Sequence, residues 1–122
     1  MKRIIIAGCR NYTNYCEAKE YIDYCLSDIG NSHEIIIISG GCNGADMIGE
    51  RYAEENNFII ERYPAQWSKY GKKAGPIRNK TMAEVADFVI CFWDGKSKGT
   101  RSMIQFAKHY QKPLRVYLIN KK

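Results

Sequence analysis

The chain contains short runs of apolar residues, and the segments between these runs have apolar residues at helical spacing. The runs at 2–8, 35–39 and 87–93 are apolar at successive positions rather than at alternate ones. Successive apolar positions are typical of strands that are covered on both faces. Two more polar segments, at 58–62 and 114–119, are predicted as further strands, and the polarity of the first indicates an edge of the sheet.

Helices are predicted between these strands, because apolar residues recur there at steps of three and four positions. Gly30 and Asn31 are expected to end the first helix, and Pro76 suits the first turn of the third. The predicted helices cover residues 14–28, 44–56, 76–86 and the segment around 103–110. The longest irregular stretch is expected at 64–75, and a turn is expected at 95–99.

The alternation of strands and helices predicts an α/β fold. We expect one doubly wound, Rossmann-like domain over residues 1–122, with a mainly parallel five-stranded sheet and helices on both faces. Right-handed crossovers place all strand-to-helix turns at one edge of such a sheet, and ligands bind outside the carboxyl ends of its strands. The turns selected by this rule are 8–13, 39–46, 63–78 and 93–100.

The second of these turns has Gly40, Gly41 and Gly44 between a buried strand and a helix. Glycines let a ligand approach the backbone, and free amides at a helix start favour phosphate. The alternative role of these glycines is a tight turn with close packing of the helix on the sheet. The spacing matches neither G-x-G-x-x-G nor a Walker motif, which disfavours hydride transfer and ATP hydrolysis by those routes.

Polar residues follow the other strands at the same predicted edge. Arg78 can donate two hydrogen bonds to a phosphate, and Asn79 can pair with a base or a ribose. Trp93 either stacks on a base or closes the top of the core, and Gly99 with Thr100 starts a helix that offers a second phosphate contact. The candidate ligand-binding residues are Gly8, Arg10, Asn11, Gly40, Gly41, Asn43, Gly44, Asp46, Arg78, Asn79, Trp93, Gly99 and Thr100.

Two carboxylates follow the glycine turn. Asp46 either caps the helix or accepts a hydrogen bond from a ribose hydroxyl. Glu50 lies one turn further on the same face, within reach of the cleft or of a neighbouring arginine. If the protein is an enzyme, Asp46 or Glu50 would be its catalytic group, because cleavage of a base from a sugar needs a carboxylate near the anomeric carbon.

The net charge of +6 favours an anionic partner, either a phosphorylated small molecule or nucleic acid, although a solvated lysine surface alone would also explain it. The basic residues gather in two groups. These are Lys69, Lys72, Lys73, Arg78 and Lys80, and then Lys96, Lys98 and Arg101.

The five cysteines are odd in number and none has C-x-x-C spacing, which disfavours zinc and disulfides. We expect reduced thiols, no metal and no cofactor. Cys42 lies in the glycine turn, but His33 and His109 lie elsewhere, so a catalytic cysteine has no base. No apolar run approaches the roughly 20 residues that span a bilayer, and a strand begins near the N-terminus in place of a signal peptide. A cytoplasmic location is therefore expected.

Four motifs in order along the chain resemble the YspA-like branch of the SLOG superfamily, a Rossmann-like group that includes the Lonely-Guy phosphoribohydrolases and the DprA DNA-processing proteins. The motifs are IAGCRNY at 6–12, SGGCNGAD at 39–46, AGPIRNKTM at 74–82 and FWDGKSKGT at 92–100. The resemblance implies a nucleotide or nucleotide-derived ligand, such as a relative of ADP-ribose, in bacterial or phage conflict. It also implies that relatives often associate, which exposed tyrosines at 21, 24, 52 and 110 would permit.

Three functions follow. The first is a sensor or sequestering protein for a nucleotide-derived ligand. The second is a nucleotide N-glycosidase like the Lonely-Guy enzymes, which Asp46 and Glu50 disfavour because neither lies at the spacing those enzymes use. The third is binding of nucleic acid, since the turn at 44–46 resembles that of DprA.

Overall fold

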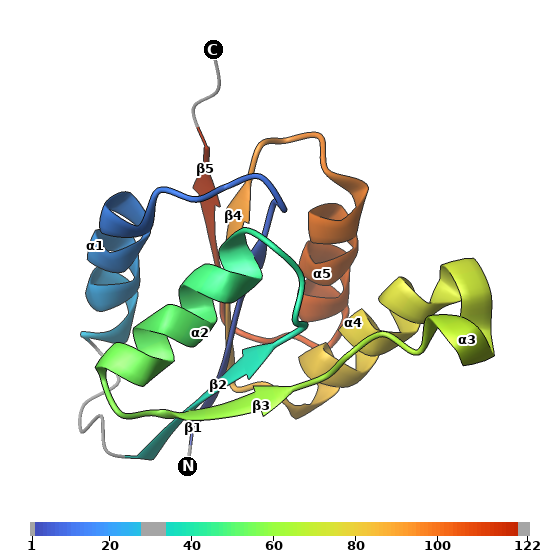
Figure 1. Cartoon of the computed structure of the whole chain (residues 1–122), viewed down its shortest axis with the longest axis horizontal. Helices are drawn as coiled ribbons and strands as arrows, with labels where there is room; N and C mark the ends of the chain where they lie inside the picture. The colour runs from blue at the N-terminus through green and yellow to red at the C-terminus, as the bar shows by residue number, and fades with distance from the viewer. Residues whose placement is uncertain (1, 28–33, 120–122) are drawn as a thin grey trace.

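Five parallel strands form one sheet in the order β3-β2-β1-β4-β5 in the computed structural model, which describes residues 2–27 and 34–119 (Figure 1). The strands are β1 (Lys2–Gly8), β2 (Ile35–Ser39), β3 (Ile59–Arg62), β4 (Phe88–Trp93) and β5 (Leu114–Leu118). The helices are α1 (Tyr15–Leu26), α2 (Ala45–Glu55), α3 (Trp67–Tyr70), α4 (Ala74–Val85) and α5 (Lys98–His109), with a 3₁₀ turn, η2 (Gly71–Lys73), between α3 and α4.

All the strand pairings are parallel, and β3 lies at an edge. The predicted α/β fold, the parallel sheet and the edge position of the 58–62 strand are therefore confirmed. The predicted bounds of the first two strands, 2–8 and 35–39, also match the structure.

The central strand β1 explains why its apolar residues are consecutive. Ile4 and Ile6 belong to a core with α1 and α2, whereas Ile5 and Ala7 belong to a second core with α4 and α5. The side chains of a strand point to opposite faces in turn, so the part of β1 that is covered on both faces is apolar at successive positions. The helices thus cover both faces of the sheet (Figure 1).

The stretch expected to be irregular at 64–75 is mostly helical, and that prediction was wrong. The amides of Lys69 and Tyr70 both donate to the Gln66 carbonyl oxygen, which forms the one turn of α3. Gly71 has φ of 59° and ends that turn. Helix α4 then begins at Ala74, two residues before Pro76. A single turn has no helical periodicity, so the sequence pattern missed it.

Two further predictions need correction. Helix α5 begins at Lys98, because the Ser97 side chain caps it by accepting from the Thr100 amide at 3.4 Å, so the turn expected at 95–99 is shorter.

Tyr52, expected as an exposed position for association, is only 3% exposed, and its hydroxyl donates to Asp23. In contrast, Tyr24 is 66% exposed.

Some predictions lie outside the described residues, namely the helix end at Gly30 and Asn31 and the loop position of His33. Among the described helices, none is long and apolar enough to cross a membrane.

Candidate functional site

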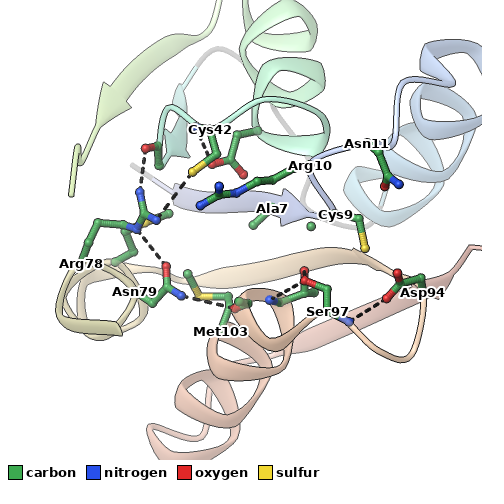
Figure 2. Close-up of a pocket in the computed structure, with 16 residues that line it drawn as sticks. Ala7, Cys9, Arg10, Asn11, Cys42, Arg78, Asn79, Asp94, Ser97 and Met103 are labelled. Carbon is green, nitrogen blue, oxygen red and sulfur yellow. Dashed lines mark hydrogen bonds between the residues drawn. The ribbon is translucent and has the colours of Figure 1, made fainter. Parts of the chain in front are cut away.

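A cavity of about 450 Å³ opens at the carboxyl ends of the strands, where the sheet order reverses around β1 (Figure 2). The turns after β1, β2 and β4, the middle of α4 and the first half of α5 form its walls. The lining residues are Ala7, Gly8, Cys9, Arg10, Asn11, Gly40, Cys42, Asp46, Arg78, Asn79, Met82, Asp94, Ser97, Gly99, Thr100 and Met103.

Most of the predicted ligand-binding residues line this cavity. They are Gly8, Arg10, Asn11, Gly40, Asp46, Arg78, Asn79, Gly99 and Thr100. Gly41 and Asn43 line a second hollow of about 460 Å³ beside it, and Gly44 with Asn43 lines a third of about 410 Å³. Arg10 borders all three hollows.

Arg78 reaches from α4 across the cavity to the glycine turn (Figure 2). Its Nη1 donates to the carbonyl oxygen of Gly40 at 2.7 Å, and its Nε donates to Asn79 Oδ1 at 2.9 Å. Its Nη2 lies 3.7 Å from the Cys42 sulfur, a weak contact. No ion pair with a carboxylate engages Arg78 within residues 2–27 and 34–119. Its positive charge is thus held in place by neutral partners.

Gly40 makes this arrangement possible. A Cβ at this position would lie 2.6 Å from Arg78 Nη1 and 2.9 Å from Asp46 Oδ2, both closer than real Cβ atoms come. The missing side chain therefore admits the protein's own arginine to the backbone, where the sequence predicted the approach of a ligand.

The amides of the glycine turn are mostly engaged within the protein. The Gly41 amide donates to Ser39 Oγ, the Cys42 amide to Asp46 Oδ2 and the Ala45 amide to the Cys9 carbonyl oxygen, each at 3.1 Å. The glycine turn therefore has fewer free amides for a phosphate than predicted. Positive charge at the cavity comes chiefly from arginine side chains.

Gly44 is required for steric reasons. It has φ of 80°, and a Cβ there would collide with the carbonyl oxygens of Cys9 and Arg10. This glycine lets the turn after β2 lie against the turn after β1, which is the packing role that the sequence left open.

Asp46 is 6% exposed and lines the cavity from the first turn of α2. Burial raises the pKa of its carboxyl to about 6, although the Cys42 amide and the nearby charge of Arg78 act in the opposite direction. The Asp46 carboxylate thus accepts from the Cys42 amide in the glycine turn and faces the cavity, whereas α2 has no side-chain cap at Gly44, so the capping interpretation was wrong.

Arg10 extends into the cavity from the turn after β1 (Figure 2). In the part of the chain that the structure describes, its side chain has no hydrogen bond and no ion pair. It therefore provides a guanidinium with all its donors available beside Arg78.

The opposite wall is the capped start of α5. Asp94 Oδ1 accepts from the amides of Lys96 and Ser97 at 2.8 Å each, and Asn79 Nδ2 donates to the Gly99 carbonyl oxygen at 3.4 Å. Asn79 is 9% exposed. Its side-chain nitrogen links α4 to α5, and its side-chain oxygen accepts from Arg78 and so orients the guanidinium.

Glu50 and Trp93 do not line any of these three hollows. Glu50 accepts from Ser39 Oγ at 2.7 Å and from two nitrogens of Arg62 at 2.8 and 3.1 Å. Burial opposes its ionisation, but these hydrogen bonds outweigh burial and lower the pKa of Glu50. Trp93 donates from Nε1 to the Ser97 carbonyl oxygen at 3.1 Å and packs against both cores, so it closes the core.

Several lining residues escaped prediction, and some had a usable signal. Met82 and Met103 lie four residues after Arg78 and Gly99, which places each one helical turn below a predicted residue. Ser97 stands three residues before Thr100, which is the spacing of a helix cap. The remaining lining residues outside the prediction are Ala7, Cys9, Cys42 and Asp94.

All five cysteines are free, and the thiols of Cys9, Cys25 and Cys91 are buried. Within the described ranges, no group of three or more His, Cys, Asp or Glu side chains is arranged to hold a metal ion.

Comparisons with known proteins agree with this architecture. Residues 2–70 match the model of the YspA, cpYpsA-related SLOG family. Gene 61 protein of Mycobacterium phage D29 is 32% identical over an alignment of 115 positions, which covers 88% of this chain and 90% of the phage protein.

A solved structure of DNA processing protein A from Helicobacter pylori, described for its single-stranded DNA binding mode, is similar with a TM-score of 0.66 at 25% identity. The similarity covers 94% of this chain and 64% of the other, so this chain spans less than two thirds of that protein. Arg10 and the glycine turn lie inside the segment matched by the family model, whereas Arg78 and α5 lie beyond it.

Proposed function

Because the chain belongs to the YspA, cpYpsA-related SLOG family, we propose that it binds a nucleotide-derived, phosphate-bearing ligand, such as a relative of ADP-ribose, as a sensor or sequestering protein. The ligand occupies the cavity at the carboxyl ends of the strands. Its phosphate lies between Arg10 and Arg78.

The observation that carries this proposal is the pair of guanidiniums at one cavity. Arg78 is oriented by Gly40 and Asn79, and Arg10 has its donors available. Guanidiniums match the geometry of phosphate, and the hydrogen bonds of Arg78 go to neutral groups, although the Asp46 carboxyl lies near it. The cavity volume of about 450 Å³ also suits a small molecule, since ligand pockets measure roughly 300 to 1,000 Å³.

Isothermal titration calorimetry tests the proposal with ADP-ribose, cyclic ADP-ribose isomers, NAD, nucleoside monophosphates and ribose 5-phosphate. The Arg10→Ala variant should weaken binding at least tenfold, because a charge-assisted contact is lost. Arg10 is exposed and unpartnered in the described chain, so this variant should keep its fold. Arg115→Ala, which removes an exposed arginine of β5, is the matched control and should bind normally. A folded protein that binds none of these compounds contradicts the proposal.

Hydrolysis of the ligand is the alternative, and the cavity position of Asp46 favours it. A carboxyl with a pKa of about 6 can exchange a proton near neutral pH. Release of free base from a nucleotide panel tests this activity. Asp46→Asn should abolish turnover, whereas Glu50→Gln should retain it because Glu50 is paired with Arg62 outside the cavity. No base release by the unmodified protein means that it only binds.

Nucleic acid binding is a third candidate, favoured by the similarity to DNA processing protein A and by the charge of residues 62–83. This segment contains six lysines and arginines and no acidic residue, namely Arg62, Lys69, Lys72, Lys73, Arg78 and Lys80. Binding of single-stranded DNA would weaken steeply with salt, because phosphate contacts release counterions. Titration of an oligonucleotide at low and moderate salt measures that dependence.

A further inference from the structure

We propose that the base of the ligand stacks on Trp67, in the second hollow that adjoins the main cavity. This inference rests on the proposed function, since it assumes that the phosphate lies between Arg10 and Arg78. It makes the ligand a nucleotide with an intact aromatic base, and it makes Trp67 a residue that determines specificity.

The second hollow is continuous with the cavity that holds the arginines. Arg10, Gly40, Cys42 and Arg78 line both spaces. On the far side of the second hollow is the segment that leads into α3, with Pro64, Ala65 and Trp67. If the phosphate of a ligand binds at these shared residues, the rest of the ligand can extend either into the main cavity or towards the indole of Trp67.

Trp67 has an unusual position for a tryptophan. Its side chain is 52% exposed and belongs to neither hydrophobic core. The tip of the indole, Cη2, lies 3.5 Å from the place where a Cβ of Gly75 would be, so one part of the ring is held against the start of α4. The rest of the aromatic surface remains open, and covering it with a flat ring removes apolar area from water.

The other tryptophan shows the contrast. Trp93 is half-buried between both cores, and its indole N–H donates to the Ser97 carbonyl oxygen. No hydrogen bond engages the indole of Trp67 among residues 2–27 and 34–119. The requirements of the fold account for Trp93 and leave the open aromatic surface of Trp67 unexplained.

The segment that carries Trp67 is anchored to the phosphate side of the site. The Tyr63 amide donates to the Ser39 carbonyl oxygen at 2.8 Å, at the end of β2, and Arg78 Nη1 lies 3.4 Å from the Tyr63 carbonyl oxygen. Helix α3 projects away from the sheet beside the start of α4 (Figure 1). The indole and the guanidinium are thus positioned relative to each other by the same backbone.

The charge around Trp67 also suits a nucleotide. Lys69, Lys72 and Lys73 follow it directly, and no acidic residue occurs between Glu61 and Glu84. A phosphate-bearing molecule therefore approaches this hollow without carboxylates from its own segment. Aromatic side chains stack on any base, so the platform favours a base over a bare sugar phosphate without choosing among bases.

Calorimetry with the four nucleoside monophosphates AMP, GMP, CMP and UMP and with ribose 5-phosphate tests the inference. Wild-type protein should bind at least one nucleotide about tenfold more tightly than ribose 5-phosphate, because stacking on an aromatic side chain contributes that much per base. Trp67→Ala should remove this difference and leave ribose 5-phosphate binding unchanged. Trp67→Phe should keep most of it. Circular dichroism confirms that the variants fold.

Fluorescence gives a second readout. In a Trp93→Phe background the remaining tryptophan is Trp67, since the chain has two. The nucleotide should quench its emission, whereas ribose 5-phosphate should not.

The outcomes separate the two proposals. If nucleotides and ribose 5-phosphate bind equally, or if their difference persists in Trp67→Ala, the stacking inference is wrong and the phosphate site stands. If none of these compounds binds, and ADP-ribose, its cyclic isomers and NAD do not bind either, the proposed function fails together with it. Quenching of Trp67 by an oligonucleotide alone, with no response to monophosphates, overturns the inference in favour of nucleic acid binding.

Discussion

The guanidinium of Arg78 donates a hydrogen bond of 2.7 Å to the carbonyl oxygen of Gly40, which joins helix α4 to the turn after β2. These residues are 38 positions apart in the sequence, since Gly40 follows β2 and Arg78 lies on α4, between β3 and β4. The contact works only because residue 40 has no side chain. This hydrogen bond fixes the position of the Arg78 guanidinium, which would contact a phosphate.

Gly40→Ala tests this contact directly. The added Cβ would lie within 3 Å of both Arg78 Nη1 and Asp46 Oδ2, so the arginine must move away from the turn. Because the ends of the Arg78 and Asp46 side chains can move aside, we expect a destabilisation of only about 1 kcal/mol, from the lost hydrogen bond of Arg78, and at least tenfold weaker ligand binding. Urea unfolding and calorimetry measure the two effects.

Gly99→Ala is the matched control for that substitution. Gly99 also lines the cavity, but it lies in the first turn of α5 and a Cβ there would meet nothing within 4 Å. Stability should therefore stay the same or rise by up to about 1 kcal/mol, since glycine is a poor helix former. Equal losses in the two variants would show that Gly40 has no special steric role.

Arg78→Lys tests whether the fork of the guanidinium is needed. A lysine keeps the charge but cannot donate to Gly40 and Asn79 together while offering further donors to a phosphate. We expect binding to weaken about tenfold or more, with a loss of about 1 to 2 kcal/mol of stability from the broken hydrogen bonds. If Arg78→Lys binds the ligand with unchanged affinity, the ligand needs only a positive charge at this position and not the fork of the guanidinium.

Asp46 should make stability depend on pH. Its folded pKa of about 6 exceeds the ordinary aspartate pKa of 3.8, so between these values the folded protein holds a proton that the unfolded chain has lost. Below about pH 4 the free energy of unfolding therefore includes the full contribution of the Asp46 carboxyl. This contribution of roughly 3 kcal/mol is lost as the pH rises through about 6.

Urea unfolding at pH 4.5 and 7.5 checks this expectation against Asp46→Asn, which keeps an acceptor oxygen for the Cys42 amide. The decrease with pH should be smaller in the asparagine variant. Glu50 has the opposite sign, because its lowered pKa gives stability that is lost as the pH falls. That contribution is common to both proteins and cancels in the comparison. The same decrease in both proteins would exclude Asp46 as its source.

Glu50→Gln separates the stability of the fold from the function of the site. Glu50 is paired with Arg62 and Ser39 under the turn, so its neutral replacement should cost about 1 to 3 kcal/mol of unfolding free energy. Ligand affinity should change less than twofold, because Glu50 does not line the cavity. Calorimetry on the folded variant decides, and a large loss of affinity would place Glu50 in the site after all.

Much of the fold was predictable because the strands are buried on both faces. The consecutive isoleucines at 4–6 and 35–38 leave few alternatives to a covered parallel sheet, and the topology then locates the cavity at the carboxyl ends. Arg10 and Arg78 were identified in this way, from position rather than from a motif.

The rest depends on the directions of side chains, which a pattern does not contain. Ser39 and Asp46 both accept from amides of the glycine turn, so donors that looked free are occupied. Glu50 was expected to reach the cleft or a neighbouring arginine, and it is Arg62, from the edge strand, that pairs with it. The turn 63–78 was selected as a ligand-binding segment, but the single turn of α3 is too short for a periodic signal, so the place of Trp67 beside the hollow could not be predicted.

The cavity brings together segments that are distant in the sequence, and this has a consequence for how a ligand would act on the whole molecule. Arg10 and the glycine turn come before β3 in the sequence, whereas Arg78 and α5 come after it. A molecule that contacts both sets acts as a non-covalent cross-link between the two halves of the chain. At a hundred times its dissociation constant it would raise the free energy of unfolding by about 2.7 kcal/mol, so resistance to heat or proteolysis would report how much of the protein is occupied.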